Sequence, residues 1–208
     1  MSLYKIDIGE FYESFHFRRK KELRIISGSA RGHRLKTLGG LDTRPTADRV
    51  KESMFNMITG YVQEAKILDL FAGTGNLGVE ALSRGASQAV FVDRNAEAIK
   101  VITDNLKHTK LIDKARIIKS ECDTYFASIN AQEEKFDIIF MDPPYSQEII
   151  SPTLAQIFKW QLLNKGGIIV VESDKEDALP EVRPPYAIMR SKTYGRTVVT
   201  IIIKDDDK

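Results

Sequence analysis

The chain has 208 residues, of which 42% are hydrophobic and 29% charged, and its formal net charge is +2. This length suits one domain with at most a small appendage, and no apolar run approaches the roughly 20 residues that a membrane-spanning helix needs. Cys122 is the only cysteine, which excludes an internal disulfide, and the first residues lack the pattern of a signal peptide. These features predict a globular, monomeric protein of the reducing cytoplasm.

Positive charge is concentrated near the beginning of the chain. Eight Lys and Arg residues and a single acid occur between Arg18 and Lys36. Turn residues near Ser27-Gly28 predict a small basic β-hairpin annex over residues 23–43. Such an arm on a nearly neutral body suits a polyanion such as nucleic acid, although a solvated surface without a partner is an alternative. The side chains expected to bind RNA are Arg24, Arg31, Arg34 and Lys36.

Apolar runs alternate with helix-like stretches along the rest of the chain. Apolar residues at helical spacing predict a helix over residues 47–58, with Thr46 as its N-cap. The alternation predicts an α/β fold in which helices cover both faces of a mostly parallel sheet. This main domain is expected over residues 44–204, followed by a solvated acidic tail at 205–208. Strands are expected at residues 66–70, 89–92, 115–119, 136–141, 167–171 and 197–203.

A glycine-rich turn follows the first of these strands, in the sequence Asp69-Leu-Phe-Ala-Gly-Thr-Gly75. Glycines let the backbone approach a ligand closely, and the helix after the turn offers free amide donors. The glycines also fit the dinucleotide pattern, so a nicotinamide-dependent oxidoreductase is an alternative. Asp69 favours S-adenosylmethionine instead, because a carboxylate attracts its ammonium group and would repel a pyrophosphate. Phe71, Gly73 and Gly75 are the further cofactor contacts expected in this turn.

Acidic residues also follow the second and third strands. Asp93 ends the second strand, where an acid can accept both ribose hydroxyls of a nucleoside, whichever cofactor it belongs to. After the third strand, the adenine ring is expected to meet a side-chain acceptor and a backbone amide. Glu121, with Cys122 beside it, is the preferred candidate, and Asp123 is the second. The alternative is that these acids simply open a helix with favourable dipole charge.

The sequence Asp142-Pro-Pro-Tyr145 follows the fourth strand, at the edge where open α/β sheets bind ligands. Two prolines restrict the backbone, so the turn can aim the Asp142 carboxylate and free carbonyls at one point. The exocyclic amine of a nucleobase is a poor nucleophile, and hydrogen bonds to such acceptors would localise its lone pair. Tyr145 offers a face for stacking a base that is turned out of its helix. Asp142, Pro143, Pro144 and Tyr145 are therefore the expected catalytic residues, against the alternative of a plain proline turn capped by Asp.

The histidines and the cysteine predict no metal site. His16, His33 and His108 are scattered and share no ligand spacing with Cys122. Methyl transfer to an amine needs positioning and aimed dipoles rather than a metal.

With these motifs the sequence resembles the bacterial RsmD family of ribosomal RNA guanine-N2 methyltransferases. The resemblance runs from about Leu23 to Lys204 and includes Val171-Glu-Ser173 and Tyr194-Gly195. Its most specific part is Arg44-Pro-Thr-Ala-Asp-Arg-Val-Lys-Glu-Ser-Met-Phe-Asn56, because the glycine turn and Asp-Pro-Pro-Tyr occur in many amino-methyltransferases. Residues 1–22 precede the resemblance and are expected to be an N-terminal extension outside the working enzyme.

The resemblance implies a Rossmann-like class I methyltransferase fold with a seven-stranded sheet, and S-adenosylmethionine as methyl donor. It implies as target one guanine of 16S ribosomal RNA, within the small ribosomal subunit or its assembly intermediate. It also implies that Arg44, Pro45 and Thr46 border the cofactor. The family usually has Asp-Ala where this chain has Glu121-Cys122, so the adenine contact departs from the family pattern.

Three other functions are alternatives to this one. A DNA adenine-N6 methyltransferase needs the same acceptors, but such enzymes usually carry a sizeable target-recognition insertion for which no interval here has room. A nicotinamide-dependent oxidoreductase leaves Asp142–Tyr145 unexplained. A non-catalytic RNA-binding protein would have no need of both Asp69 and Asp142.

Overall fold

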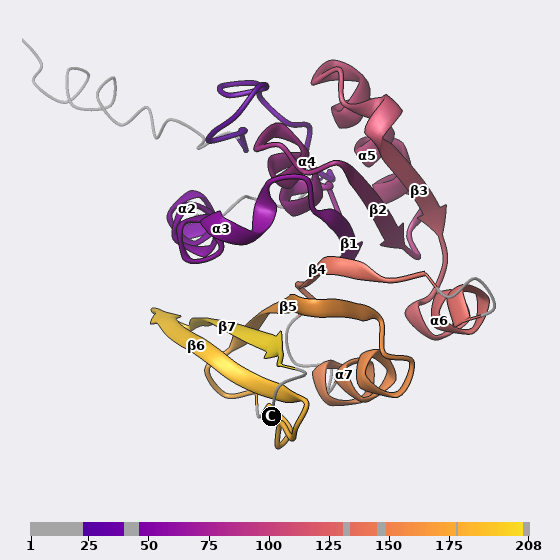
Figure 1. Ribbon diagram of the computed structural model, residues 1–208. Helices are drawn as coiled ribbons and strands as arrows, with labels where there is room; N and C mark the ends of the chain where they lie inside the picture. The colour runs from indigo at the N-terminus through magenta and orange to yellow at the C-terminus, as the bar shows by residue number, and fades with distance from the viewer. Residues whose placement is uncertain (1–22, 40–45, 131–133, 145–148, 178, 206–208) are drawn as a thin grey trace, which may run out of the picture.

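The computed structural model describes residues 23–39, 46–130, 134–144, 149–177 and 179–205. Its strands are β1 (Lys66–Leu70), β2 (Gln88–Asp93), β3 (Ala115–Lys119), β4 (Phe136–Met141), β5 (Leu163–Asp174), β6 (Tyr186–Tyr194) and β7 (Thr197–Lys204). They form a seven-stranded sheet in the order β3-β2-β1-β4-β5-β7-β6 (Figure 1). The pairs from β3 to β5 are parallel, and β7 runs antiparallel to both β5 and β6. The predicted mostly parallel sheet is therefore confirmed.

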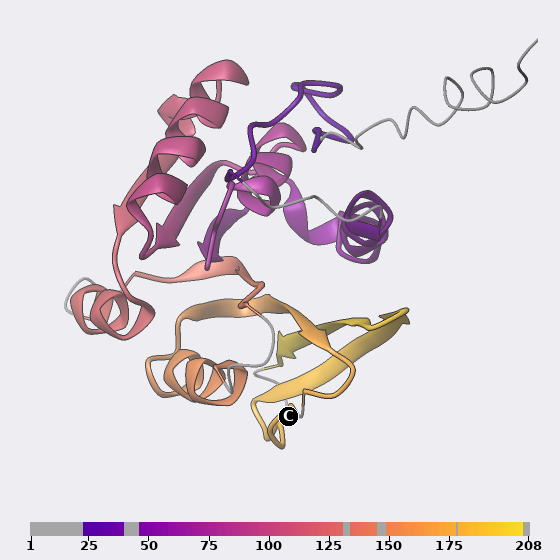
Figure 2. The ribbon, with the colours of Figure 1, turned by 180° about the vertical axis from the view of Figure 1, so that it is seen from behind.

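Helices cover both faces of this sheet. They are α2 (Thr46–Met57), α3 (Thr59–Val62), α4 (Asn76–Ser83), α5 (Ala96–His108), α6 (Cys122–Asn130), α7 (Ile150–Lys159) and the short 3-10 helix η1 (Ile112–Lys114). The helices α2 to α5 pack on one face, whereas α6 and α7 pack on the other, as Figure 2 shows from behind. Adjacent residues of a strand therefore enter different cores, as Ile67 and Leu68 of β1 do. This double covering explains why the central strands are almost continuously apolar.

Residues 23–36, called the annex below, form an antiparallel hairpin beside α4 and α5. The amide of Ile25 donates to the carbonyl of His33 at 2.9 Å, and the amide of Leu35 donates to the carbonyl of Leu23 at 2.7 Å. Leu23, Ile25 and Leu35 are buried, whereas the arginines of the bridge between Arg24 and Arg34 are exposed. The predicted hairpin is confirmed, as one antiparallel bridge rather than two regular strands.

The backbone of the annex lies directly against α4. The carboxylate of Glu80, which is fully buried, accepts the amides of Ile26 at 2.8 Å and Ser27 at 3.0 Å. Gly28 has φ +86°, and a Cβ at this position would lie 1.8 Å from the carbonyl oxygen of Ser83. Only glycine fits both this conformation and this spacing. The annex is therefore fixed to α4 by backbone contacts and not only by side chains.

All the predicted strands are present, and the sequence prediction missed one strand. The bounds of β1, β3 and β4 agree with the prediction, those of β2 extend one residue further at each end, and β7 extends one residue further at its C-terminal end. The prediction for β5 was too short, because the strand begins four residues earlier, before Gly166 with its φ of +71°. β6 was missed: side chains 188–193 are all exposed, so this edge strand has no alternation of apolar and polar residues.

Candidate active site

A cavity of about 830 Å³ opens at the carboxyl ends of β1 to β5. This volume lies within the range of small-molecule and cofactor sites, roughly 300–1,000 Å³. Its wall includes the glycine turn, Asp93 and the Ser120–Asp123 segment, together with Asp142, Pro143 and Pro144. The structure thus brings together predicted residues from four separate strand ends.

The glycine turn has a strained but well-supported backbone. Phe71, Gly73 and Gly75 all have positive φ, at 59°, 55° and 76°. Such a value is uncommon for a phenylalanine and is found mainly where the surrounding structure enforces it. The amide of Ala72 donates to the carbonyl of Val92 at 3.0 Å, which ties the turn to β2. The turn is therefore held in one shape, with Phe71 in the cavity wall.

Asp69 lies at the inner end of the cavity and is 2% exposed. Its Oδ2 accepts the amide of Gly78, in the first turn of α4, at 2.8 Å. Burial raises the pKa of the Asp69 carboxyl to about 8, the Gly78 hydrogen bond opposes this shift, and the charge of Asp93 adds to it. A ligand cation beside Asp69 would favour the ionised carboxylate and bind tightly in return.

Asp93, at the end of β2, is half-buried and connects two loops. Its Oδ2 accepts the amide of Gly73 and its Oδ1 accepts the amide of Asn95, both at 2.8 Å. A carboxylate has about four acceptor positions on its two oxygens, so it can still accept ligand hydroxyls. The expected contact of Asp93 to a ribose stays a prediction.

The segment after β3 forms the opposite part of the wall. Glu121 is exposed, with its Oε2 3.9 Å from Nη1 of Arg94, and Cys122 begins α6. Burial raises the pKa of the Cys122 thiol to about 12, and the charges of Asp123 and Glu121 contribute. A thiol with so high a pKa is not a nucleophile at neutral pH. This segment can contact a ligand but offers no covalent chemistry.

Asp142 follows β4, and its side chain is exposed at the wall of the cavity. Partial removal from water inside the cavity raises the pKa of Asp142 well above its usual range, and the charges of Glu172 and Asp69 raise it further. Pro143 is buried and Pro144 is exposed. Met141 pairs with Val171, so Asp142, just after β4, lies beside Glu172 of β5. Tyr145, the fourth predicted catalytic residue, lies outside the described residues.

Six carboxyl groups and one guanidinium line the described part of the cavity: Asp69, Asp93, Glu121, Asp123, Asp142 and Glu172, with Arg94. A pyrophosphate would be repelled by such a wall, whereas a cation would be attracted. S-adenosylmethionine fits this wall, because it presents an ammonium, a sulfonium and two ribose hydroxyls. The described residues contain no group of three or more side chains that could hold a metal ion.

Comparisons with known proteins agree with this geometry. A family model described as Conserved hypothetical protein 95 matches residues 23–203. The protein YlbH of Bacillus subtilis (strain 168) is 43% identical over 88% of this chain and 99% of its own length. The Escherichia coli (strain K12) protein named Ribosomal RNA small subunit methyltransferase D is 33% identical over 84% of this chain and 86% of its own length. The chain belongs to the RsmD family.

Structural comparison places this RsmD-family chain in the Rossmann-like class I methyltransferase fold. The solved structure of the Escherichia coli protein yhhF has a TM-score of 0.79 and 32% sequence identity, and the match covers 89% of this chain and 99% of that one. The resemblance read from the sequence is thereby confirmed, and the chain is a methyltransferase. Residues 1–22 fall outside the range that the family model matches.

The first three residues of the RsmD-family motif cannot be placed in the cavity. Arg44 and Pro45 lie outside the described residues, and Thr46 begins α2 but its side chain is not among those described. Their role at the cofactor stays a prediction.

Asn105 on α5 joins the annex to the glycine turn, and sequence reasoning missed it. Its side chain is 1% exposed; Nδ2 donates to the carbonyls of Lys36 at 3.1 Å and Thr74 at 2.9 Å, and Oδ1 accepts the amide of Lys36 at 2.8 Å. The only signal in the sequence is a polar residue on a helix face that otherwise carries Ala98 and Ile102. Beyond the annex, Thr37 and Leu38 continue into the cavity wall.

Lys51 on α2 forms a second buried connection. Its Nζ donates to the carbonyl of Arg24 and to Oδ1 of Asn76, both at 2.7 Å, and lies 3.1 Å from Oε2 of Glu80. Burial lowers the pKa of Lys51, and the charge of Glu80 opposes this shift. Asn76 also lines the cavity, so the annex, α2 and the start of α4 meet at one polar centre.

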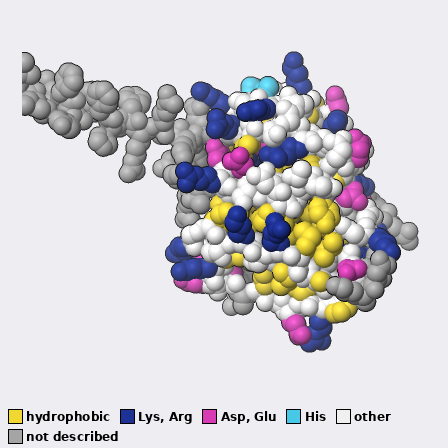
Figure 3. All heavy atoms as spheres, turned by 60° about the vertical axis from the view of Figure 1, so that its left-hand side comes forward, with side chains coloured by type: hydrophobic (Ala, Val, Ile, Leu, Met, Phe, Trp, Pro, Cys, Tyr) yellow, Lys and Arg dark blue, Asp and Glu magenta, His cyan; other side chains and the backbone are white. Residues whose placement is uncertain are grey.

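The four residues expected to bind RNA are exposed on the annex and not in the cavity: Arg24, Arg31, Arg34 and Lys36. Figure 3 shows Lys and Arg side chains gathered at the top of the view, on the side that carries the annex. Nζ of Lys36 lies 2.8 Å from Oδ2 of Asp104, and Nε of Arg24 lies 3.8 Å from Oδ2 of Asp48. Exposed ion pairs of this kind are weak, so these charges can exchange to a phosphate. No described helix is long and apolar enough to cross a membrane.

Proposed function

We propose that the protein transfers a methyl group from S-adenosylmethionine to the exocyclic N2 amine of a guanine in 16S ribosomal RNA. The observation that carries this proposal is that Asp69 and Asp142 share one cavity at the carboxyl edge of the sheet. One carboxyl group suits the cation of the methyl donor, and the other suits an amine. The protein is proposed to bind this RNA within the small ribosomal subunit or its assembly intermediate.

The cofactor is proposed to lie along the β1 to β3 side of the cavity. Asp69 holds the ammonium group, Asp93 accepts the ribose hydroxyls, and the Glu121-Cys122 segment meets the adenine. Gly73 lines the cavity and lets the backbone come close to the cofactor, whereas Gly75 is packed against Phe91, Val79 and Ile102 and shapes the turn. The bound cofactor supplies a methyl group on a positively charged sulfur, which an amine can attack directly.

Asp142 is proposed to prepare the amine for attack. Its carboxylate and a carbonyl of the proline turn accept hydrogen bonds from the two N–H groups and so localise the nitrogen lone pair. As the N–C bond forms and the S–C bond breaks, the nitrogen becomes positively charged and must lose a proton. The raised pKa of Asp142 suits it to accept that proton. Positioning and aimed dipoles supply most of the acceleration.

Two observations support ribosomal RNA as the substrate class. Relatives at 32% and 33% identity carry the name Ribosomal RNA small subunit methyltransferase D. The exposed basic side chains of the annex offer phosphate contacts on the rim of the molecule.

The test uses S-adenosylmethionine with a tritiated methyl group and three substrates: unmodified 30S particles, naked 16S RNA and duplex DNA. We expect label in the ribosomal RNA, recovered as N2-methylguanosine after digestion to nucleosides and mass spectrometry. Label in N6-methyladenine of DNA would instead establish the alternative enzyme class. The Asp142→Ala variant, assayed in parallel, controls for a contaminating methyltransferase.

A further inference from the structure

Glu172 carries a carboxyl group at the candidate active site to which none of the motifs assigns a role. It lies near the end of β5, half-buried, and lines the same cavity as Asp142. The parallel pairing of Met141 with Val171 puts the next residues of the two strands, Asp142 and Glu172, at neighbouring positions. Glu172 itself pairs with Val199 of β7, which fixes the backbone at this position.

The strand order separates Glu172 from the proposed cofactor contacts. Those contacts follow β1, β2 and β3, whereas Asp142 follows β4 and Glu172 lies on β5, in a sheet with the order β3-β2-β1-β4-β5. Glu172 therefore lies beyond Asp142 as seen from the glycine turn. A group in this position lies on the side of Asp142 away from the proposed cofactor contacts.

The edges of guanine and adenine differ at the atom beside the amine. Guanine carries an N1–H donor next to its N2 amine, whereas adenine carries an N1 acceptor next to its N6 amine. An ionised carboxylate can only accept hydrogen bonds. A second carboxylate beside Asp142 thus complements guanine, and it would face the N1 lone pair of adenine with no proton between them.

We propose that Glu172 accepts the N1–H of the target guanine and so determines the choice of guanine over adenine. This inference rests on the proposed guanine-N2 activity. Asp142 accepts a hydrogen bond from the amine, and Glu172 accepts one from the neighbouring ring nitrogen. The negative charge of Glu172 also raises the pKa of Asp142, which agrees with the closeness of the two groups.

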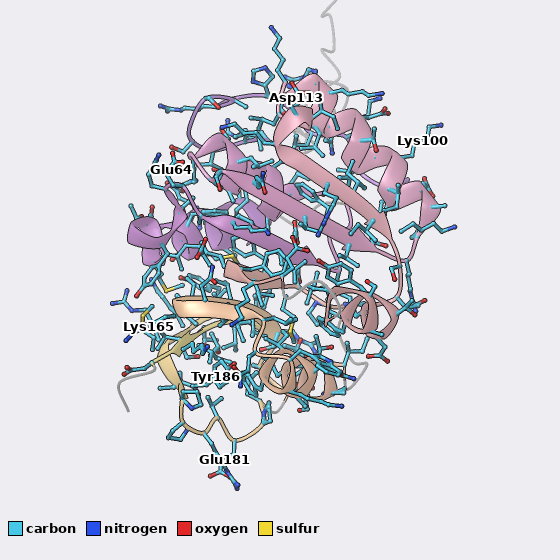
Figure 4. All side chains as sticks on the ribbon, turned by 45° about the vertical axis from the view of Figure 1, so that its right-hand side comes forward. Glu64, Lys100, Asp113, Lys165, Glu181 and Tyr186 are labelled. Carbon is cyan, nitrogen blue, oxygen red and sulfur yellow. The ribbon has the colours of Figure 1, made fainter. Side chains whose placement is uncertain are left out.

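The test compares two bases that both carry a 2-amine. The methylated nucleotide is first mapped with wild-type protein, and 16S RNA is then rebuilt by ligation with 2-aminopurine at that position and assembled into 30S particles. 2-Aminopurine keeps the amine, but its N1 is an acceptor without a proton. Single-turnover rates are measured for the wild type, Glu172→Gln and Glu172→Ala. Glu181→Gln is the control: it changes an equivalent carboxylate that is 72% exposed, at the loop end labelled in Figure 4.

We expect the wild type and Glu181→Gln to prefer guanine by roughly 10²-fold or more, because N1 of 2-aminopurine carries no proton for the Glu172 carboxylate to accept. Glu172→Gln should reduce this preference at least tenfold, since its amide can donate to N1 of 2-aminopurine. Glu172→Ala should also reduce it, mainly by slowing methylation of guanine. Affinity for S-adenosylmethionine, measured by calorimetry, should stay within about threefold of wild type in every variant.

Three results would overturn the inference. An unchanged guanine preference in both Glu172 variants would show that this side chain does not read N1. A large loss of S-adenosylmethionine affinity in Glu172→Gln would assign Glu172 to the cofactor instead. A wild-type product other than N2-methylguanosine would remove the proposed function itself, and the nucleoside analysis separates that failure from the other two.

Discussion

At the scale of single residues, Asp69 is where binding and stability have opposite requirements. Its carboxyl group is buried and has a pKa of about 8 in the folded protein, against 3.8 as the ordinary value. Between these two pKa values, the Asp69 carboxyl group is ionised in the unfolded chain but stays mostly protonated in the folded chain. The contribution of Asp69 to the free energy of unfolding is fully present below about pH 4 and is lost as the pH rises from about 4 to about 8.

Asp69→Asn should relieve this conflict. An amide oxygen can still accept the amide of Gly78, and no charge is buried. We expect the variant without cofactor to melt above the wild type at pH 7; even about 1 kcal/mol corresponds to about 2–4 °C for a chain of this size. The difference should vanish near pH 4, and calorimetry should detect little binding of S-adenosylmethionine. Thermal melts across pH 4–8 check this, and a variant less stable than wild type at pH 7 would contradict it.

Asp142 should show the reverse pattern, a loss of turnover with binding intact. Asp142→Ala removes an acceptor that matters most in the transition state, so the single-turnover rate should fall by roughly 10²–10³, with little change in cofactor affinity. Asp69→Ala should primarily weaken cofactor binding. Rates on 30S particles and calorimetric titrations of both variants make the comparison. A near-normal rate for Asp142→Ala would refute its catalytic role.

At the scale of elements, the joint between the annex, α5 and the glycine turn depends on Asn105. Asn105→Ala would leave the backbone groups of Lys36 and the carbonyl of Thr74 without this partner, at a cost of roughly 1–3 kcal/mol. Because Thr74 belongs to the glycine turn, cofactor affinity should fall as well. Thr103→Ala on the same helix is the control, since that hydroxyl donates only within the helix, to Ile99 at 2.7 Å. Equal melting temperatures and affinities for the two variants would show that the joint is unimportant.

Elements that depend on local pattern were predictable from the sequence, and those that depend on distant contacts were not. Phe136–Met141 is an unbroken apolar run, and the glycine turn is defined by its own residues. The bonds of Asn105 to Lys36 join positions 69 residues apart, which no local pattern records. Glu172 belongs to the site only because β5 pairs with β4. The exposed edge strand β6 had no apolar periodicity to reveal it.

At the scale of the whole molecule, the exposed charges of the annex should govern RNA affinity. Changing Arg31, Arg34 and Lys36 to Glu should weaken RNA binding, and each lost phosphate contact should lower the log–log salt slope by about 1. Affinity for S-adenosylmethionine should persist. A variant with Lys159, Lys165 and Lys175 changed to Glu alters net charge equally, away from the annex. Filter binding at several salt concentrations measures both, and equal losses would show that net charge alone matters.

The contact of Gly28 with Ser83 makes it possible to separate the charge of the annex from its position. Gly28→Ala keeps every basic side chain, yet its methyl group would meet the Ser83 carbonyl at 1.8 Å and acts as a wedge between the annex and α4. We expect RNA affinity to fall less than about threefold, because the basic side chains are kept. Methylation of 30S particles should fall about tenfold or more, because the RNA bound to the annex no longer places the base beside the methyl donor. Filter binding and single-turnover assays measure the two effects, and equal losses would contradict this expectation. Because Gly28 has no side chain, the annex can lie directly against α4, and this contact fixes the distance between the RNA-binding charges and the active site.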